Sequence, residues 1–238
     1  MNQFIRTEML FGVEAIAKLA RSRVAVFGLG GVGGYVVEAL ARSGIGALDL
    51  VDNDTVSLSN LNRQILATHK TIGMAKTKVA AERVAEINPA CIVRIYDTFF
   101  LPENASEFDF GQYDYVVDAI DTVSGKIGLV LAAQNAGVPI ISAMGTGNKQ
   151  NPAMFKVADI YKTAVCPLAH VMRKELRRRG VKHLKVVYSE EMPLKPADNS
   201  EVEVENTKRR ATPGSTAFVP PVAGMIMAAE VVHDLCGL

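Results

Sequence analysis

The stretch RVAVFGLGGVG at residues 23–33 decides the fold class of this chain. Its apolar run 23–27 predicts a buried strand, and residues 33–42 predict a helix that begins among the last glycines. Glycines at such a turn let the backbone approach a phosphate, and the first turn of the helix offers free amide groups at its positive dipole end. The stretch therefore predicts a strand, a turn and a helix that bind a nucleotide phosphate.

Apolar runs and helical patterns continue to alternate after this unit. Strands are predicted at 47–51, 92–96, 115–118, 139–142 and 184–188, and helices at 76–87, 123–136 and 166–180. The alternation predicts an α/β fold with a doubly wound, Rossmann-like, mostly parallel sheet and a basic C-terminal extension. No linker divides residues 1–238, so we expect a single domain.

Two C-terminal segments depart from this alternation. Residues 190–215 mix charges, prolines and glycine with almost no apolar periodicity, which predicts a long mobile loop. Residues 218–235 are apolar, but Pro221, Glu230 and Asp234 interrupt them. We expect a helix buried in the core or in a dimer, and no membrane segment.

Cysteine usage indicates the cellular setting. Cys91, Cys166 and Cys236 are scattered and form no Cys-x-x-Cys pair, so the sequence predicts neither a disulfide framework nor a structural zinc site. Glu8 and Glu14 argue against a secretory signal at the N-terminus. These features predict a cytoplasmic protein.

Polar residues gather beyond the glycine loop. Asp52 ends the second predicted strand, where a carboxylate accepts the hydroxyl groups of a ribose. Arg63 suits a bidentate grip on the β- and γ-phosphates, and Lys76 adds a point charge to the same polyphosphate. Asp121 can hold Mg²⁺ through one oxygen. The residues that complete this set are Gly28, Gly30, Gly31, Gly33, Asn60, Asn62 and Gln64.

Each candidate also has a purely structural interpretation. The glycines can serve a tight turn alone, and Asp52 can be a solvated turn residue. Arg63 and Lys76 can be solvated surface cations. Asp121 can cap the helix that begins at about 123, and capping does not exclude metal binding. Asp54 is equally suited to support the site or to cap the following turn.

Five motifs resemble the ATP-binding domain of the ubiquitin-activating-enzyme superfamily, which includes the bacterial adenylyltransferases of thiamine and molybdopterin synthesis. They are GLGGVG at 28–33, DND at 52–54, SNLNRQ at 59–64, GMAK at 73–76 and DAID at 118–121. By this resemblance, the residues that contact ATP are Gly31, Asp52, Ser59, Asn60, Leu61, Asn62, Arg63, Lys76, Asp121 and Thr122. The resemblance also implies a homodimer in which Arg6 crosses to the partner's phosphates, although Arg6 can equally be a surface residue of the first helix.

Residues 142–188 are similar to the tRNA threonylcarbamoyladenosine dehydratase branch of that superfamily. The similarity lies in GTGNK at 145–149, VADIYKT at 157–163, CPLA at 166–169 and VMRKEL at 171–176. It implies that ATP is used to dehydrate N6-threonylcarbamoyladenosine in tRNA, which closes its side chain into a ring. The branch suggests cysteine-desulfurase sulfur-relay proteins as further partners. Some members carry a C-terminal membrane segment, for which this chain ends too early and too polar.

The residues are compatible with that chemistry. A carboxylate is a poor electrophile until one of its oxygens belongs to a good leaving group, and adenylation supplies that group. On this hypothesis, Arg63, Lys76, Arg6 and an Mg²⁺ held by Asp121 stabilise the α-phosphate transition state and the leaving pyrophosphate. The carbamoyl group then attacks the activated carbon and expels AMP.

A basic segment at 170–185 is a candidate surface for tRNA. Its cations are Arg173, Lys174, Arg177, Arg178, Arg179, Lys182 and Lys185. Glu175 is the one acidic residue among them. Lysine and arginine neutralise phosphates without reading sequence, which suits an anticodon stem. The alternative is an amphipathic helix with a solvated charged face.

Three questions stay open at this point. Cys166 can form a thioester or accept sulfur, or it can be an inert packed thiol. Lys149, Asp159 and Lys162 are candidates for the substrate side. Two other functions also fit part of the sequence. One is adenylation of a small sulfur-carrier protein, which the missing paired Cys-x-x-Cys zinc motifs of such activators disfavour. The other is an NAD-dependent oxidoreductase, which leaves the polar loop 60–64 unexplained.

Overall fold

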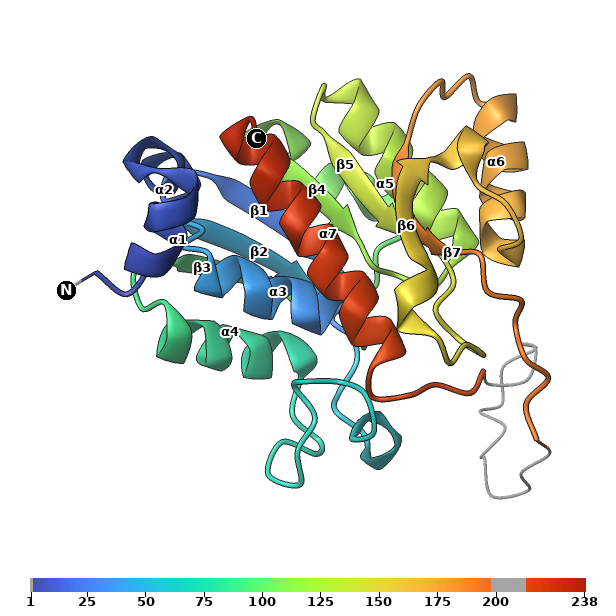
Figure 1. Ribbon diagram of the computed structural model, residues 1–238, viewed down its shortest axis with the longest axis horizontal. Coiled ribbons are helices and arrows are strands. Elements are labelled where there is room, and N and C mark those ends of the chain that lie inside the picture. Colours follow the sequence, from blue (N-terminus) through green and yellow to red (C-terminus); the bar gives the residue numbers. More distant parts are fainter. Residues whose placement is uncertain (1, 198–212) are drawn as a thin grey trace.

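A seven-stranded sheet forms the centre of the molecule, in the order β3-β2-β1-β4-β5-β7-β6 (Figure 1). The computed structural model describes residues 2–197 and 213–238. Neighbouring strands are parallel except β6 and β7, which are antiparallel. The chain winds from β1 outward to β3, and then from β4 outward in the other direction, which is the doubly wound arrangement. The predicted fold class is confirmed.

The elements have the following bounds. The strands are β1 (Arg23–Phe27), β2 (Ala47–Val51), β3 (Ile92–Tyr96), β4 (Tyr115–Asp118), β5 (Ile140–Ala143), β6 (Phe155–Asp159) and β7 (Lys185–Ser189). The helices are α1 (Ile5–Phe11), α2 (Val13–Leu19), α3 (Gly33–Arg42), α4 (Lys76–Ile87), α5 (Val123–Asn135), α6 (Pro167–Arg178) and α7 (Val219–Cys236). Two short 3-10 turns, η1 (Leu58–Asn60) and η5 (Ile160–Lys162), belong to the loops discussed below.

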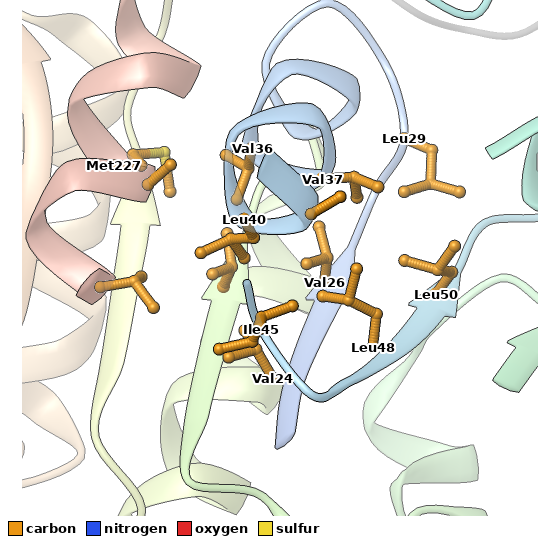
Figure 2. Packing of buried hydrophobic residues seen from close by; sticks show 14 of the residues in the cluster. Val24, Val26, Leu29, Val36, Val37, Leu40, Ile45, Leu48, Leu50 and Met227 are labelled. Carbon is orange, nitrogen blue, oxygen red and sulfur yellow. The ribbon is translucent and has the colours of Figure 1, made fainter. Parts of the chain in front are cut away.

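Helices cover both faces of the sheet (Figure 1). The side chains of Val24 and Val26 belong to the core under α3, α4 and α7. The alternate residues Ala25 and Phe27 belong to the second core, under α5 and α6. This is the two-residue period of a strand that is buried on both sides. Figure 2 shows the first of these cores, where Val36 of α3 and Met227 of α7 lie over the strands.

The C-terminal helix α7 is part of this core. By length and composition alone it could cross a membrane, with a mean hydropathy of 1.3 over 18 residues. However, 56% of that window is buried inside the molecule, where Ala223, Met227 and Val231 lie in the first core. The expectation of a helix buried in the core is confirmed.

The predicted elements agree with the observed ones to within one or two residues, but the C-terminal third needed correction. Strand β6 was not predicted, and it pairs with β7 at the edge of the sheet. The segment expected as a basic extension is not an extension, because α6 covers the second face and β7 pairs with β5. Residues 198–212 of the predicted mobile loop lie outside the described residues.

The N-terminus of α3 lies very close to the end of β1. Gly28 has a φ of +88°, which favours glycine, and a Cβ there would meet the carbonyl oxygen of Ala119 at 2.7 Å. A Cβ on Gly33 would lie only 1.8 Å from the carbonyl oxygen of Gly28. By contrast, the nearest atom to a Cβ on Gly30 is 3.9 Å away. Gly28 and Gly33 are thus required for packing, whereas Gly30 leaves open space above the loop.

Gly33→Ala and Gly30→Ala should therefore separate stability from binding. We expect Gly33→Ala to lower the free energy of unfolding by about 3 kcal/mol or more, because backbone must move to admit the methyl group. Gly30→Ala should fold almost as well as wild type but bind nucleotide at least about tenfold more weakly, because its methyl group enters the space for the phosphates. Urea denaturation and calorimetry measure the two effects, and equal stability losses in both variants would contradict this prediction.

Candidate functional site

The carboxyl ends of β1, β2 and β4 lie side by side. We call this row of strand ends the carboxyl edge, and "this edge" refers to it below. The amide of Gly28 donates to the carbonyl of Val51, and the amide of Ala119 donates to the carbonyl of Phe27, each at 2.8 Å. These bonds hold the loops after the three strands against one another. The direction of winding reverses between β1 and β4. In doubly wound sheets, ligands bind at the carboxyl ends of the strands at this point.

Asp52 fixes the glycine loop. Its carboxylate accepts the amide of Leu29 at 2.6 Å and the amide of Asp54 at 2.8 Å. Burial is the largest influence on this group and raises the pKa of Asp52, although Lys76 and the two amides act in the opposite direction. A carboxylate has about four acceptor positions, so some remain for ribose hydroxyls. The bond to Leu29 contradicts the interpretation of Asp52 as a solvated turn residue.

Lys76 is a buried cation at the start of α4. Its side chain is 5% exposed, and its Nζ donates to Asp54 Oδ2 at 2.8 Å. The interpretation of Lys76 as a solvated surface residue is therefore wrong. Asp54 itself is exposed, so it supports the site through Lys76 rather than from within the core. An ammonium group has three protons, and Asp54 engages one of them.

The loop around η1 holds Arg63 in one orientation. Its Nη1 donates to the carbonyl of Ser59 and to Asn62 Oδ1, each at 2.9 Å. Asn62 in turn donates to the carbonyl of Ser215, at 3.1 Å, and Asn60 accepts the amide of Ser57. Partial burial lowers the pKa of Arg63, which stays cationic at physiological pH. Both asparagines thus shape the loop that presents the guanidinium group.

Two buried oxygen atoms at this edge have no hydrogen-bond partner among the described residues. They are Gln64 Oε1 and Thr122 Oγ1. Buried polar atoms are nearly always paired, so each indicates a missing donor. The hydroxyl groups of a ribose or the amino group of a base can supply one. Together with the open space over Gly30, these atoms fit a bound nucleotide.

Asp121 is exposed in the loop between β4 and α5. It does not cap α5, because the N-cap position belongs to Thr122, which makes no capping hydrogen bond. The structural interpretation of Asp121 is therefore wrong. The described part of the chain holds no group of three or more histidine, cysteine or acidic residues suited to a metal. A lone carboxylate beside phosphates is nevertheless how proteins commonly hold Mg²⁺.

Arg6 lies at the end of the sheet opposite the carboxyl edge of its own chain. It is exposed on α1, and α2 leads directly into the amino end of β1, where Ser22 donates its amide to Leu19. Figure 1 shows α1 and α2 beside that end of the sheet. The loops of the site follow the opposite, carboxyl ends of the strands. Arg6 thus cannot reach the phosphate site of its own chain.

The cations of α6 are only partly available. Arg173 donates to both oxygens of Thr163, and Arg178 and Arg179 pair with Glu175. The guanidinium of Arg177 lies over the ring of Tyr161, at 5.2 Å from its centroid. Lys174 and Lys182 are also exposed. Arginines held in place in this way still present an exposed positive surface along α6.

Lys185 does not belong to that surface, which corrects the sequence prediction. It lies in β7, and its Nζ pairs with Glu230 at 3.0 Å and with Asp234 at 2.7 Å, both on α7. Since α7 and α6 cover opposite faces of the sheet, Lys185 is separated from the cations of α6. Lys185 is close to α6 in sequence, but its position in β7 directs its side chain to the face of the sheet that α7 covers.

The remaining candidates are mainly structural. Cys166 precedes α6 and is 1% exposed, which favours the interpretation as an inert packed thiol. Asp159 caps η5 through the amide of Tyr161 and also accepts the amide of Leu184. Lys149 is buried and donates to the carbonyl of Glu191, while Lys162 is exposed.

Sequence reasoning missed Lys126, which is 1% exposed and pairs with the fully buried Asp118. The signal was present, because Lys126 is the single charge in the otherwise apolar helix α5. A lone lysine on a buried face requires an acidic partner. Asp118 ends β4, directly before the loop that carries Asp121, so this pair belongs to the surroundings of the site.

A doubly wound sheet with these residues at its switch point defines a nucleotide-binding α/β protein. The chain belongs to the ThiF family, whose profile matches residues 4–238. It is 43% identical to a tRNA threonylcarbamoyladenosine dehydratase of Bacillus subtilis, over 99% of this chain and 95% of the relative. It is 40% identical to the Escherichia coli enzyme of that name, over 74% of this chain and 66% of that protein.

Solved structures agree with this assignment. The E. coli tRNA N6-threonylcarbamoyladenosine dehydratase TcdA, in complex with ATP, superposes with a TM-score of 0.88 and 32% identity, over 99% of this chain and 94% of that chain. The complex of TcdA with AMP gives a TM-score of 0.89 over the same shares. E. coli MccB, at 21% identity and a TM-score of 0.70, shares the fold.

Asp52→Asn should change how folding stability depends on pH. The pKa of Asp52 is raised in the folded state above its ordinary value of 3.8. The wild-type carboxyl therefore contributes stability at low pH that is lost as the pH rises through the raised pKa. Asparagine does not titrate, so the variant should gain stability relative to wild type as the pH rises from about 4 through the raised pKa of Asp52. Urea denaturation across this range measures the difference, and a constant difference would contradict the prediction.

Proposed function

We propose that this protein uses ATP to dehydrate N6-threonylcarbamoyladenosine in tRNA to its cyclic form. The observation that carries the proposal is the 43% identity over 99% of the chain to a dehydratase of that name. The likeness to TcdA in complex with ATP supports the same site for the nucleotide. The arrangement of Asp52, Arg63 and Lys76 at one edge supports it independently, because these residues suit a ribose and a polyphosphate.

The reaction requires a leaving group on the threonyl carboxylate. A carboxylate oxygen attacks the α-phosphorus of ATP, and pyrophosphate leaves. Arg63 and Lys76 stabilise the negative charge that develops on the phosphates, in a site that is partly closed to water. Asp121 would hold Mg²⁺, which would supply further positive charge at the phosphates.

The second step closes the ring. The carbamoyl group attacks the activated carbonyl carbon, and AMP leaves with one oxygen of the original carboxylate. The net loss from the nucleoside is one water molecule. Because both reacting groups belong to one side chain, the protein mainly has to position them. No thiol takes part, which agrees with the burial of Cys166, and no zinc is needed.

The proposal includes a homodimer. Among the exposed large apolar residues are Ile5, Met9, Leu10 and Val13 of the α1–α2 segment, with exposures from 41% to 81%. Helix α1 has no buried residue of its own. Such a surface requires a cover, and a second copy would also bring its Arg6 to the phosphates. Arg6 lies too far from the site of its own chain to act there.

The exposed cations of α6 would receive the tRNA backbone. Lys174, Arg177 and Arg178 of α6 are exposed, and so are Arg179 and Lys182, which follow the helix. Free cysteines and a tRNA substrate agree with a cytoplasmic location. Sulfur-relay proteins remain further partners of this proposal, but the buried Cys166 would not receive their sulfur.

Incubation with ATP and tRNA that carries the modification tests the function. Nucleoside mass spectrometry should detect the loss of one water from threonylcarbamoyladenosine, and only when ATP is present. With the carboxylate labelled with heavy oxygen, one label should appear in AMP. Unlabelled AMP would contradict the adenylate route, and an unchanged nucleoside would contradict the function.

Charge reversal on α6 tests the tRNA surface. We expect Arg177→Glu, Arg178→Glu and Arg179→Glu together to weaken tRNA binding about tenfold or more at moderate salt, with ATP binding unchanged. Lys185→Met is the matched control, because this cation lies on the other layer and should leave tRNA affinity unaltered. Filter binding at several salt concentrations measures both, and equal losses in the two variants would place the RNA elsewhere.

A further inference from the structure

A buried network of charges lies beneath the loop that carries Asp121. Lys126 Nζ donates to Asp118 Oδ1 at 3.0 Å, and their side chains are 1% and 0% exposed. Ser142 of β5 donates to the other carboxylate oxygen of Asp118, and its Oγ lies 3.3 Å from Lys126 Nζ. The network joins the carboxyl ends of β4 and β5 to the first turn of α5.

A lysine at this place is unfavourable for stability by itself. It lies at the positive end of the dipole of α5, where cations are disfavoured. Its burial costs hydration, and well-packed apolar residues in place of a buried ion pair are often as stable or more stable. The neighbours Ile127, Leu129 and Val130 are already buried apolar residues. Stability alone therefore gives no reason for Lys126.

The pair does restrain the loop of the site. Asp118 Oδ1 also accepts the amide of Ile120 at 3.3 Å. Asp121 is thus fixed from both sides, by Ile120 before it and by the first turn of α5 after it. That turn is tied to the sheet through Lys126. These contacts restrain the backbone of residues 118–122.

We propose that Lys126 is a positioning residue for Asp121. By tying α5 to Asp118, it holds the Asp121 carboxylate where the Mg²⁺ of a nucleotide complex would meet it. The proposal rests on the proposed function of the same site. It concerns nucleotide binding, so it can be tested without the tRNA reaction.

The experiment compares Lys126→Met with wild type. Calorimetry of ATP binding at increasing Mg²⁺ concentration gives the concentration at half-maximal effect. We expect this concentration to rise about tenfold in the variant, equivalent to about 1.4 kcal/mol. ATP affinity without Mg²⁺ and tRNA affinity should stay within about twofold of wild type. If the single variant does not fold, the double variant Lys126→Met with Asp118→Asn removes both charges. It should raise the Mg²⁺ concentration at half-maximal effect by the same factor.

A second buried pair provides the matched control. Arg23 pairs with Asp49 near the amino end of the sheet, where the side chains are 17% and 0% exposed. Arg23→Met should lose stability but keep the Mg²⁺ dependence of wild type. If it displaces that dependence as much as Lys126→Met, the effect is general destabilisation and the proposal fails.

Asp121→Asn separates this inference from the proposed function. It should raise the Mg²⁺ concentration at half-maximal effect at least as much as Lys126→Met does. If this concentration rises in Asp121→Asn but not in Lys126→Met, only the positioning role of Lys126 is overturned. A displacement in Lys126→Met with none in Asp121→Asn also overturns it, because the effect then bypasses Asp121. Failure of the dehydratase function would appear separately, as an unchanged nucleoside in the wild-type reaction.

Discussion

The close approach between the N-terminus of α3 and the end of β1 is the constraint on which the site depends. Gly33 has no room for a side chain against the carbonyl of Gly28, and Gly28 itself lies against Ala119 after β4. Because these backbones touch, the loops after three strands form one surface. The same contact places the positive end of the α3 dipole beside the space over Gly30. A looser turn would separate the groups that must reach one phosphate chain.

Several buried or partly buried charges lie at this end of the sheet. Lys76 is buried on Asp54, Lys126 is buried on Asp118, and the carboxylate of Asp52 is partly buried on backbone amides. Each arrangement costs hydration, and none is required by the apolar core. This end of the sheet thus carries part of the electrostatic cost of the fold, beside pairs such as Arg23 and Asp49 at the other end, and fixed charges are expected where a polyanion binds. The charges of Lys76, Lys126 and Asp52 thus lower the stability of the fold at the place where a nucleotide would bind.

The fold was largely predictable because the strands and helices from β1 to α5 each have their own pattern. Residues 33–42 and 76–87 have the observed bounds of α3 and α4, since glycine or Asn-Pro marks their limits. Strand β6 was missed because it is an edge strand whose residues are mostly exposed or half-buried, and its pairing with β7 determines it. Lys185 was misplaced for a related reason. Proximity in sequence to α6 does not reveal that a strand directs its side chain to α7.

The site was predictable as a set of residues but not as a set of roles. Asn62 was expected to contact ATP, and Asp54 to support the site or to cap a turn; in the structure Asn62 accepts from Arg63 and Asp54 accepts from Lys76. Residue type and spacing cannot distinguish a group that touches phosphate from one that orients such a group, because both are polar and adjacent. The oxygens of Gln64 and Thr122 have no partner among the described residues, and such unpaired atoms emerge only when every other hydrogen bond has been assigned. The hydrogen bonds of Asn62 and Asp54 thus set the geometry of Arg63 and Lys76, the cations to which the proposed function assigns the phosphates.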